Sequence, residues 1–162
     1  MIIHYMQDRD RALPLSPIPR KNWEIDAYPV NEIAEYVQDV SQGDIDVLVE
    51  EYYNKYDMIL DGRDPEEFKK HVAVQAGIEI GFERFLEEKK YQAIVTHFGD
   101  LGSLEQLPGL AIQRLREKGY GFGGEGDWKT AAMGIEAVYI DGDTTIRNLQ
   151  NELRWNSMYF SK

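Results

Sequence analysis

A short apolar run at Ala93–Val95 is the feature that most constrains the fold of this chain. The run is followed by Gly99 and Gly102, and a short apolar segment that ends in glycines is typical of a buried strand. A buried strand needs other elements packed around it. The run therefore predicts a sheet that is covered by helices.

Helical patterns lie on both sides of this run. Asp64 and Pro65 mark a strong helix start, because aspartate caps a helix and proline suits the first helical position. The apolar spacing carries this helix to the charged residues at 87–90. Helical spacing returns over 107–118 and stops at Gly119, a residue that readily adopts the left-handed cap.

A second apolar run, EAVYID at 136–141, predicts another strand. The DGD sequence at 141–143 then predicts a turn, and the spacing over 144–156 predicts a helix. Strands that alternate with helices predict an α/β fold. We expect a single three-layer-like domain with a mainly parallel sheet flanked by helices.

Two shorter helices are expected nearer the N-terminus. The first is predicted from an apolar spacing over 33–40, with Asn31 as its cap. The second follows Asp44 and carries tyrosines along one flank at Tyr52, Tyr53 and Tyr56. Core or interface packing is the favoured interpretation of these tyrosines, ahead of a role in ligand binding.

The chain divides into an N-terminal arm at 1–21 and an α/β domain at 22–162. Pro14, Pro17 and Pro19 predict the arm, because they remove backbone donors and favour extended neighbours. No disulfide framework or cysteine nucleophile is expected, because the chain of 162 residues contains 0 cysteines. A net charge of -11 argues against nucleic-acid binding. No membrane span or secretory signal is predicted, so a cytoplasmic location is expected.

The stretch GFGGEGDWKT at 121–130 holds the candidate site residue, Glu125. Its glycines do not form a phosphate-binding loop, but they allow a close backbone approach at the carboxyl edge of a sheet, where α/β proteins usually bind ligands. A carboxylate there suits a divalent metal or proton transfer. The alternative is that Glu125 is only a loop acid near a helix start that Asp127 caps.

The imidazoles and hydroxyls give weaker signals. The histidines are His4, His71 and His97, and only His97 lies at an expected strand end, beside Gly99 and Asp100. A single histidine without a second one at helical spacing is a weak metal signal. None of the serines lies in a nucleophile elbow, so nucleophilic hydrolysis is not expected.

Four stretches of the chain resemble the L-arabinose isomerase family. QLPGLAIQRL and EGDWKTAA strongly resemble the middle of those enzymes, and WEIDAYPV resembles the start of their central domain. IEAVYIDGDTTIRNLQNELRWNSMYF is similar to their extreme C-terminus. The likeness runs from Trp23 to Phe160, and residues 1–20 have no match.

The resemblance implies an aldose–ketose isomerase that converts L-arabinose to L-ribulose with manganese, a pentose substrate and homo-oligomeric assembly. It also implies that Glu125 matches one of two metal-binding glutamates, where carboxylates move a proton between adjacent carbons. In the family a long stretch with the other ligands follows EGDWKTAA. Here Gly134 and Ile135, which already resemble the tail, follow almost at once. Only Glu125 is therefore carried over as a catalytic and metal-binding residue.

Three functional hypotheses follow. The first is an isomerase-derived, internally deleted domain without an N-terminal domain, which lacks turnover on its own and acts in oligomer assembly. The second is a compact metal-dependent sugar isomerase or sugar-binding protein, in which Glu125, Asp127, His97 and Asp100 rebuild a site at a subunit contact. The third is an interaction module that uses the tyrosine flank or the arm. The first is favoured, because the family's histidine ligands are missing.

Overall fold

The computed structural model describes residues 2–8, 23–97, 99 and 101–140. Along the chain the elements are β1 (Ile2–Asp8), β2 (Trp23–Pro29), α1 (Val30–Gln38), α2 (Gln42–Lys55), α3 (Pro65–Lys89), β3 (Ala93–Val95), α4 (Gly109–Glu117), β4 (Gly121–Gly123) and α5 (Trp128–Ile140). The turn and helix expected over 141–156 lie outside the described residues. None of the helices in the described ranges is long and apolar enough to cross a membrane.

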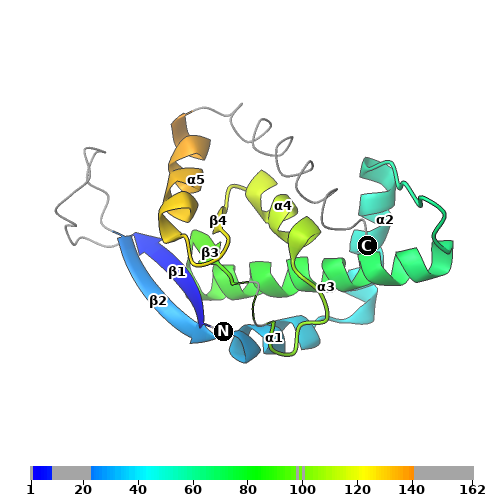
Figure 1. Ribbon diagram of the computed structural model, residues 1–162, viewed down its shortest axis with the longest axis horizontal. Helices are drawn as coiled ribbons and strands as arrows, with labels where there is room; N and C mark the ends of the chain where they lie inside the picture. The colour runs from blue at the N-terminus through cyan, green and yellow to red at the C-terminus, as the bar shows by residue number, and fades with distance from the viewer. Residues whose placement is uncertain (1, 9–22, 98, 100, 141–162) are drawn as a thin grey trace.

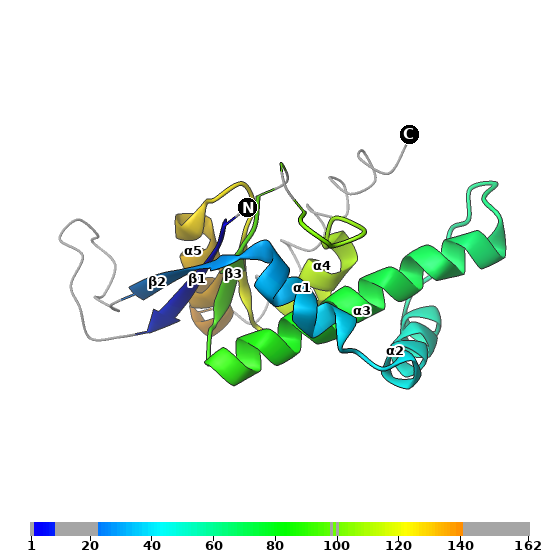
Figure 2. The same ribbon diagram turned by 90° about the horizontal axis from the view of Figure 1, so that it is seen from below.

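The strands form one sheet in the order β2-β1-β3-β4. β1 runs antiparallel to both of its neighbours, and β3 and β4 run parallel. Figures 1 and 2 show this sheet at one end of the molecule, beside α5, with α2 at the opposite end. The long helix α3 spans the distance between them.

β3 separates two hydrophobic layers. Ile94 belongs to a core that it shares with α1, α3 and α4. Ala93 and Val95, which point to the other face of the strand, pack against α5. The domain therefore has helices on both faces of the sheet, and the expected three-layer-like α/β arrangement is confirmed.

A separate apolar cluster joins α2 to the first half of α3. Its buried members are Val49, Tyr52, Val72 and Ala76. Of the tyrosine flank, Tyr52 is fully buried, Tyr56 packs against the cluster, and Tyr53 is 41% exposed. Core packing therefore accounts for Tyr52 and Tyr56, as expected, but not for Tyr53.

Two expectations about the sheet need correction. The sheet is mixed rather than mainly parallel, since only β3 and β4 run parallel. Residues 2–8, expected to belong to an extended arm, form β1 in the interior of the sheet. The prolines that suggested an arm all lie in 9–22, outside the described residues, so they said nothing about the segment before them.

The strand expected at 136–141 is wrong for residues 136–140, which continue helix α5. A short apolar run fits a buried helix as well as a strand. The spacing of Ala131, Ala132 and Ile135, which all pack on β3, is helical and extends the same face. The helix therefore does not stop at Gly134 as the strand assignment required.

The expected helix ends are confirmed for α3 and α4 but not for α1. Asp64 accepts a hydrogen bond from the Glu67 amide at the start of α3, and Gly119 has φ +98° after α4. Asn31 does not cap α1, which begins one residue earlier at Val30. Its side chain instead accepts a hydrogen bond from the amide of Ser103, and so fixes the loop between β3 and α4.

Helices α1 and α3 approach so closely that only glycine fits at one position. A Cβ added to Gly81 would lie 2.6 Å from Cα of Val37 and 2.7 Å from its backbone nitrogen. Gly77, one turn earlier on α3, has room for a Cβ, which would make only an ordinary van der Waals contact with the Ile45 side chain, at 3.5 Å. The two glycines share a helix but differ in their surroundings.

We predict that Gly81→Ala lowers the free energy of unfolding by about 1 to 3 kcal/mol, because α1 must move away from α3. Gly77→Ala is the matched control and should raise it by up to about 1 kcal/mol, the helix-propensity gain of alanine over glycine. Urea denaturation followed by circular dichroism measures both. Equal effects of the two substitutions would contradict the close approach.

Candidate functional site

The loop that carries Glu125 is fastened to the end of β3. The Thr96 amide donates to the carbonyl of Gly123 at 3.2 Å, and the Gly126 amide donates to the carbonyl of Thr96 at 3.3 Å. Because β3 and β4 run parallel, their carboxyl ends lie at the same edge of the sheet. Glu125 follows β4 at this edge, the usual ligand-binding edge in α/β proteins.

The glycines of β4 bring α5 directly against the strand. A Cβ on Gly123 would lie 1.9 Å from the carbonyl oxygen of Asp127, and one on Gly121 would lie 2.2 Å from that of Ala131. Only glycine fits at either position. The glycine-rich sequence therefore serves close packing of backbone on backbone.

Asp127 caps helix α5. Its Oδ1 accepts hydrogen bonds from the amides of Lys129 and Thr130, both at 3.1 Å, and its Oδ2 accepts one from the Thr130 hydroxyl. The hydrogen bonds from Thr130 are the main reason that the pKa of Asp127 lies below its ordinary value. Since Asp127 supplies the cap, the helix start does not need Glu125 as well.

Glu125 is exposed and has a left-handed backbone with φ +55°. This conformation costs a residue with a side chain roughly 1 kcal/mol or more relative to glycine. Glycine precedes and follows it in the chain, so glycine would have been the unstrained choice here too. Strain of this kind collects at functional sites. Asp61 and the α3 cap residue Lys90 share this left-handed backbone, so the conformation alone assigns no role, and a catalytic or metal-binding role for Glu125 stays a prediction.

No described hydrogen bond or ion pair joins the other sequence candidates to Glu125. His97 Nδ1 accepts a hydrogen bond from the Gly99 amide at 3.0 Å. His71 of α3 forms a hydrogen bond with Gln106. Asp100 lies outside the described residues. His4 lies in β1. Within the described part of the chain, no three His, Cys, Asp or Glu residues are grouped closely enough to hold a metal ion.

One further polar group lies at this edge. Thr96 is only 4% exposed, and its hydroxyl has no hydrogen-bond partner among the described residues. Burying a hydroxyl without a hydrogen-bond partner costs free energy. Besides the Glu125 carboxylate, the Thr96 hydroxyl is therefore a second polar group at this edge that no hydrogen bond explains. Nothing in the sequence around Thr96 distinguished it from an ordinary strand-end threonine.

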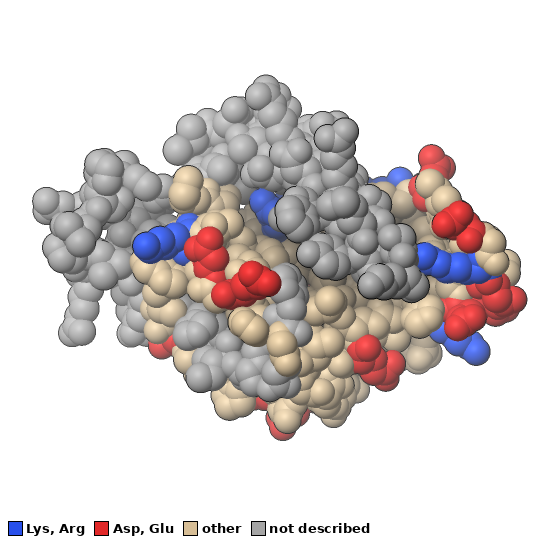
Figure 3. All heavy atoms as spheres, viewed as in Figure 1, with Lys and Arg blue, Asp and Glu red and all other residues tan. Residues whose placement is uncertain are grey.

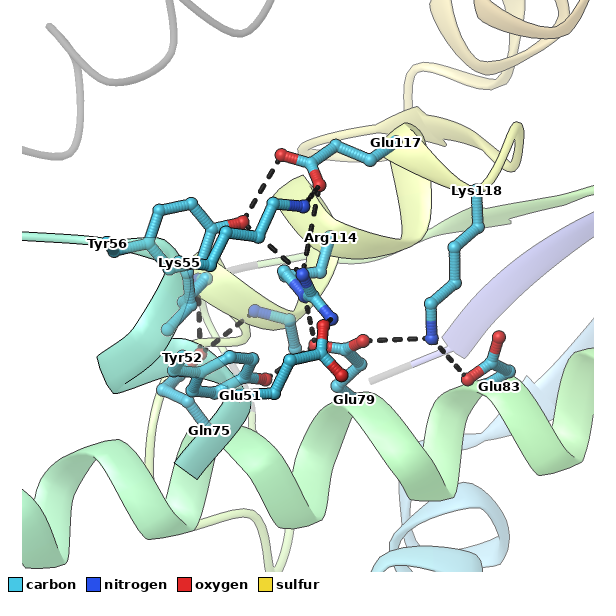
Figure 4. Close-up of polar contacts among 12 residues, drawn as sticks. Glu51, Tyr52, Lys55, Tyr56, Gln75, Glu79, Glu83, Arg114, Glu117 and Lys118 are labelled. Carbon is cyan, nitrogen blue, oxygen red and sulfur yellow. Dashed lines mark hydrogen bonds and ion pairs between the residues drawn. The ribbon is translucent and has the colours of Figure 1, made fainter. Parts of the chain in front are cut away.

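Sequence reasoning missed the most densely charged cluster of the described residues, shown in Figure 4. At its centre the fully buried Glu79 of α3 accepts a hydrogen bond from the Tyr52 hydroxyl and pairs with Arg114 at 3.2 Å and Lys118 at 2.9 Å. We call it the Glu79 network; its members are Glu51, Tyr52, Glu79, Glu83, Arg114, Glu117 and Lys118. The sequence did contain a signal for a buried acid, because Glu79 lies on the apolar face of α3, between Gln75–Ala76 and Phe82.

Carboxylates outnumber cations in the Glu79 network, where Arg114 and Lys118 are shared among Glu51, Glu79, Glu83 and Glu117. Burial alone would lower the pKa of Arg114, but hydrogen bonds to Tyr56, Glu51 and Glu79 outweigh burial and raise it above its ordinary value. Burial, followed by the charge of Glu79, raises the pKa of Tyr52, which stays protonated and donates. Each buried charge therefore has an oppositely charged neighbour, although Glu79 Oε1, which lies 2.9 Å from Lys118 Nζ, accepts no hydrogen bond of good geometry among the described residues. The network ties α4, the helix that leads into β4, to α2 and α3, and its role is structural.

We predict that Arg114→Met lowers the free energy of unfolding by about 3 kcal/mol, because Glu79 stays buried with one fewer cation. Replacing both groups, as in Glu79→Met with Arg114→Met, should cost less than the sum of the single changes by at least about 1 kcal/mol. Urea denaturation of the wild type, both single variants and the double variant completes the cycle. Additive effects would show that Glu79 and Arg114 do not interact.

A second prediction concerns the strain at Glu125. Glu125→Gly should raise the melting temperature, because glycine adopts positive φ without a steric cost. Glu125→Ala is the control that removes the carboxylate but keeps the Cβ, and it should leave the melting temperature close to that of the wild type. Differential scanning calorimetry separates the two cases. A stabilisation by alanine as large as that by glycine would mean that the charge, and not the backbone, is unfavourable.

The chain is similar to known proteins over most of its length. Residues 19–141 match the family model of the L-arabinose isomerase central domain. The L-arabinose isomerase of Geobacillus kaustophilus (strain HTA426) is 42% identical over 124 residues, which is 76% of this chain and 25% of that protein. L-arabinose isomerase 1 of Clostridium acetobutylicum is 47% identical over 111 residues, 68% of this chain and 23% of that protein.

The L-arabinose isomerase of Serratia proteamaculans (strain 568) is 44% identical over 121 residues, 74% of this chain and 24% of that protein. The chain thus spans about a quarter of the length of the curated relatives it matches. The matched region includes β2, the Glu79 network, β3, β4 and the loop of Glu125. This chain belongs to the L-arabinose isomerase family.

Proposed function

We propose that this chain is an L-arabinose isomerase-like domain that carries one carboxylate of a sugar isomerase centre and has no turnover on its own. The observation that carries the proposal is Glu125, which is exposed and strained at the carboxyl edge of the sheet while Asp127 does the capping. The relatives at 42–47% identity are named L-arabinose isomerases, which supports aldose–ketose isomerisation as the reaction class.

The chemistry explains why one carboxylate is insufficient. Converting an aldose to a ketose removes a proton from one carbon and returns it to the adjacent carbon, while the neighbouring oxygens exchange their roles. A carboxylate can move that proton as a general base and then a general acid. The developing negative charge on oxygen needs separate stabilisation by other groups. Glu125 can supply the proton transfer but not both functions.

Manganese, the expected cofactor, does not find a full ligand set in the described residues. Manganese is usually held by several oxygen or nitrogen ligands that converge on one ion. Among the described residues at this edge, Glu125 is a carboxylate without a hydrogen bond or ion pair to another described residue, whereas Asp127 is committed to α5. We therefore assign no manganese-dependent step to this chain, and we propose that any further ligands come from other residues or from a second polypeptide.

Homo-oligomeric assembly is part of the proposal. Exposed apolar side chains on the described surface include Val47 of α2 at 70%, Ile59 at 78% and Met133 of α5 at 62%.

On the face in Figure 3, charges of both signs are interspersed over α2 and the start of α3. This supports a solvated or protein-binding surface over a nucleic-acid site, which needs concentrated positive charge. A cytoplasmic location stays a prediction.

We predict no conversion of L-arabinose to L-ribulose above the level of Glu125→Gln when the purified chain is assayed with manganese. A single carboxylate lacks the partners that stabilise the transition state. Glu50→Gln, which changes an exposed acid on α2, is the matched control for loss of one charge. Turnover that Glu125→Gln abolishes and Glu50→Gln leaves intact would overturn the proposal. It would instead favour a compact isomerase with a site rebuilt at a subunit contact.

A further inference from the structure

A groove lies between α1, the start of α2, α3 and the loop that joins β3 to α4. Its volume is about 280 Å³. Small-molecule sites in proteins usually measure roughly 300–1,000 Å³, so this groove suits a compact ligand. None of its lining residues belongs to the Glu79 network or to the loop of Glu125. The groove is therefore separate from both features described above.

Most of the groove is lined by apolar groups. Val37 of α1, Ile45 of α2 and Leu104 of the loop contribute aliphatic side chains. On α3, Ile78 adds another, whereas Gly77 adds none and leaves space, because a Cβ there would meet nothing closer than Cδ1 of Ile45, at 3.5 Å. The groove can therefore take a compact hydrocarbon group out of water.

The charged lining of the groove has one sign. Glu105 contributes a carboxylate, and none of the described lining residues is a lysine or an arginine. Glu105 is exposed and has no hydrogen bond or ion pair to another described residue, so its charge is available to a ligand. The side-chain oxygens of Gln38, Gln42 and Ser103, which also line the groove, can accept hydrogen bonds from a ligand.

The two helix ends beside the groove do not change this preference. α1 ends at Gln38, where the last carbonyl groups give a partial negative charge, and its last turn contains no basic residue. α2 begins at Gln42 with a partial positive charge. Each partial charge is about half a unit and the two have opposite signs, so they largely cancel. The full charge of Glu105 then makes the groove favour a cation.

We propose that this groove binds a small aliphatic ammonium ion. The hydrocarbon part of the ligand lies against Val37, Ile45 and Leu104, and its ammonium group pairs with the carboxylate of Glu105. An anion of the same shape would meet Glu105 with no lining cation to offset the repulsion. The proposal does not involve Glu125 and stands apart from the proposed isomerase function.

Three probes that share one ring test the proposal. Cyclohexylamine is a cation at neutral pH, cyclohexanol is uncharged and cyclohexanecarboxylate is an anion. Each is titrated into the purified full chain while the backbone amide signals are followed by NMR. Cyclohexylamine should give saturable shifts at Val37, Gly77 and Leu104. It should bind about 2- to 5-fold more tightly than cyclohexanol, the range for an exposed ion pair, and cyclohexanecarboxylate should bind more weakly than either.

Variants locate the charge and the groove. Glu105→Gln should reduce the affinity for cyclohexylamine to about that for cyclohexanol, because it removes the charge and keeps the size of the side chain. Glu50→Gln, which changes an exposed acid outside the groove, is the matched control and should leave the affinity unchanged. Ala73→Leu enlarges a half-buried lining residue and should abolish binding of all three probes. Val74→Phe replaces it if circular dichroism shows that Ala73→Leu does not fold.

Shifts that do not saturate, or that lie away from the lining residues, would overturn the proposal. Equal affinities for the three probes would show that the groove does not select by charge. A loss of affinity in Glu50→Gln as large as that in Glu105→Gln would show that the amine follows the overall net charge of -11 and not this groove. Binding that survives both groove-filling substitutions would place the ligand elsewhere.

Discussion

Burial of β3 on both faces is the constraint on which the rest of the structure depends. Ile94 fixes the layer of α1, α3 and α4, and Ala93 and Val95 fix α5 on the opposite face. The same strand pairs with β4 and, through the backbone of Thr96, holds the loop of Glu125. The candidate site is therefore positioned by the core itself, and not by a loop that could move independently of it.

Two close backbone contacts and one buried charge network support this arrangement. Gly81 lets α1 lie against α3, and Gly123 lets the start of α5 lie against β4. The Glu79 network holds α4 in place immediately before β4. These features lie within the region that matches the family model, whereas β1, which completes the sheet, does not. The strand that lies between β2 and β3 is thus outside the residues that match the family model.

The sequence predicted elements whose signals were local and redundant. Asp64 and Pro65 predicted the start of α3, Gly119 predicted the end of α4, and the glycines that follow Ala93–Val95 favoured a short strand there. Prediction from the sequence failed where an element depends on contacts with residues far away along the chain. Residues 136–140 are as apolar as a strand, but they continue α5, whose earlier residues Ala131, Ala132 and Ile135 pack on β3. β1 is specified by partners far along the chain, and Glu79, although it lies on the apolar face of α3, pairs with Arg114 and Lys118, which are 35 and more residues away in the sequence.

The central claim is that the fold presents Glu125 as a single accessible carboxylate whose metal-binding partners are not supplied by its surroundings. Paramagnetic broadening of backbone amide signals during a titration with manganese tests this most directly, because it locates bound metal residue by residue. The account predicts weak broadening that does not saturate and that is spread over the acidic surface of a chain with net charge -11. Saturable broadening centred on residues 124–127 at one equivalent of metal would contradict it.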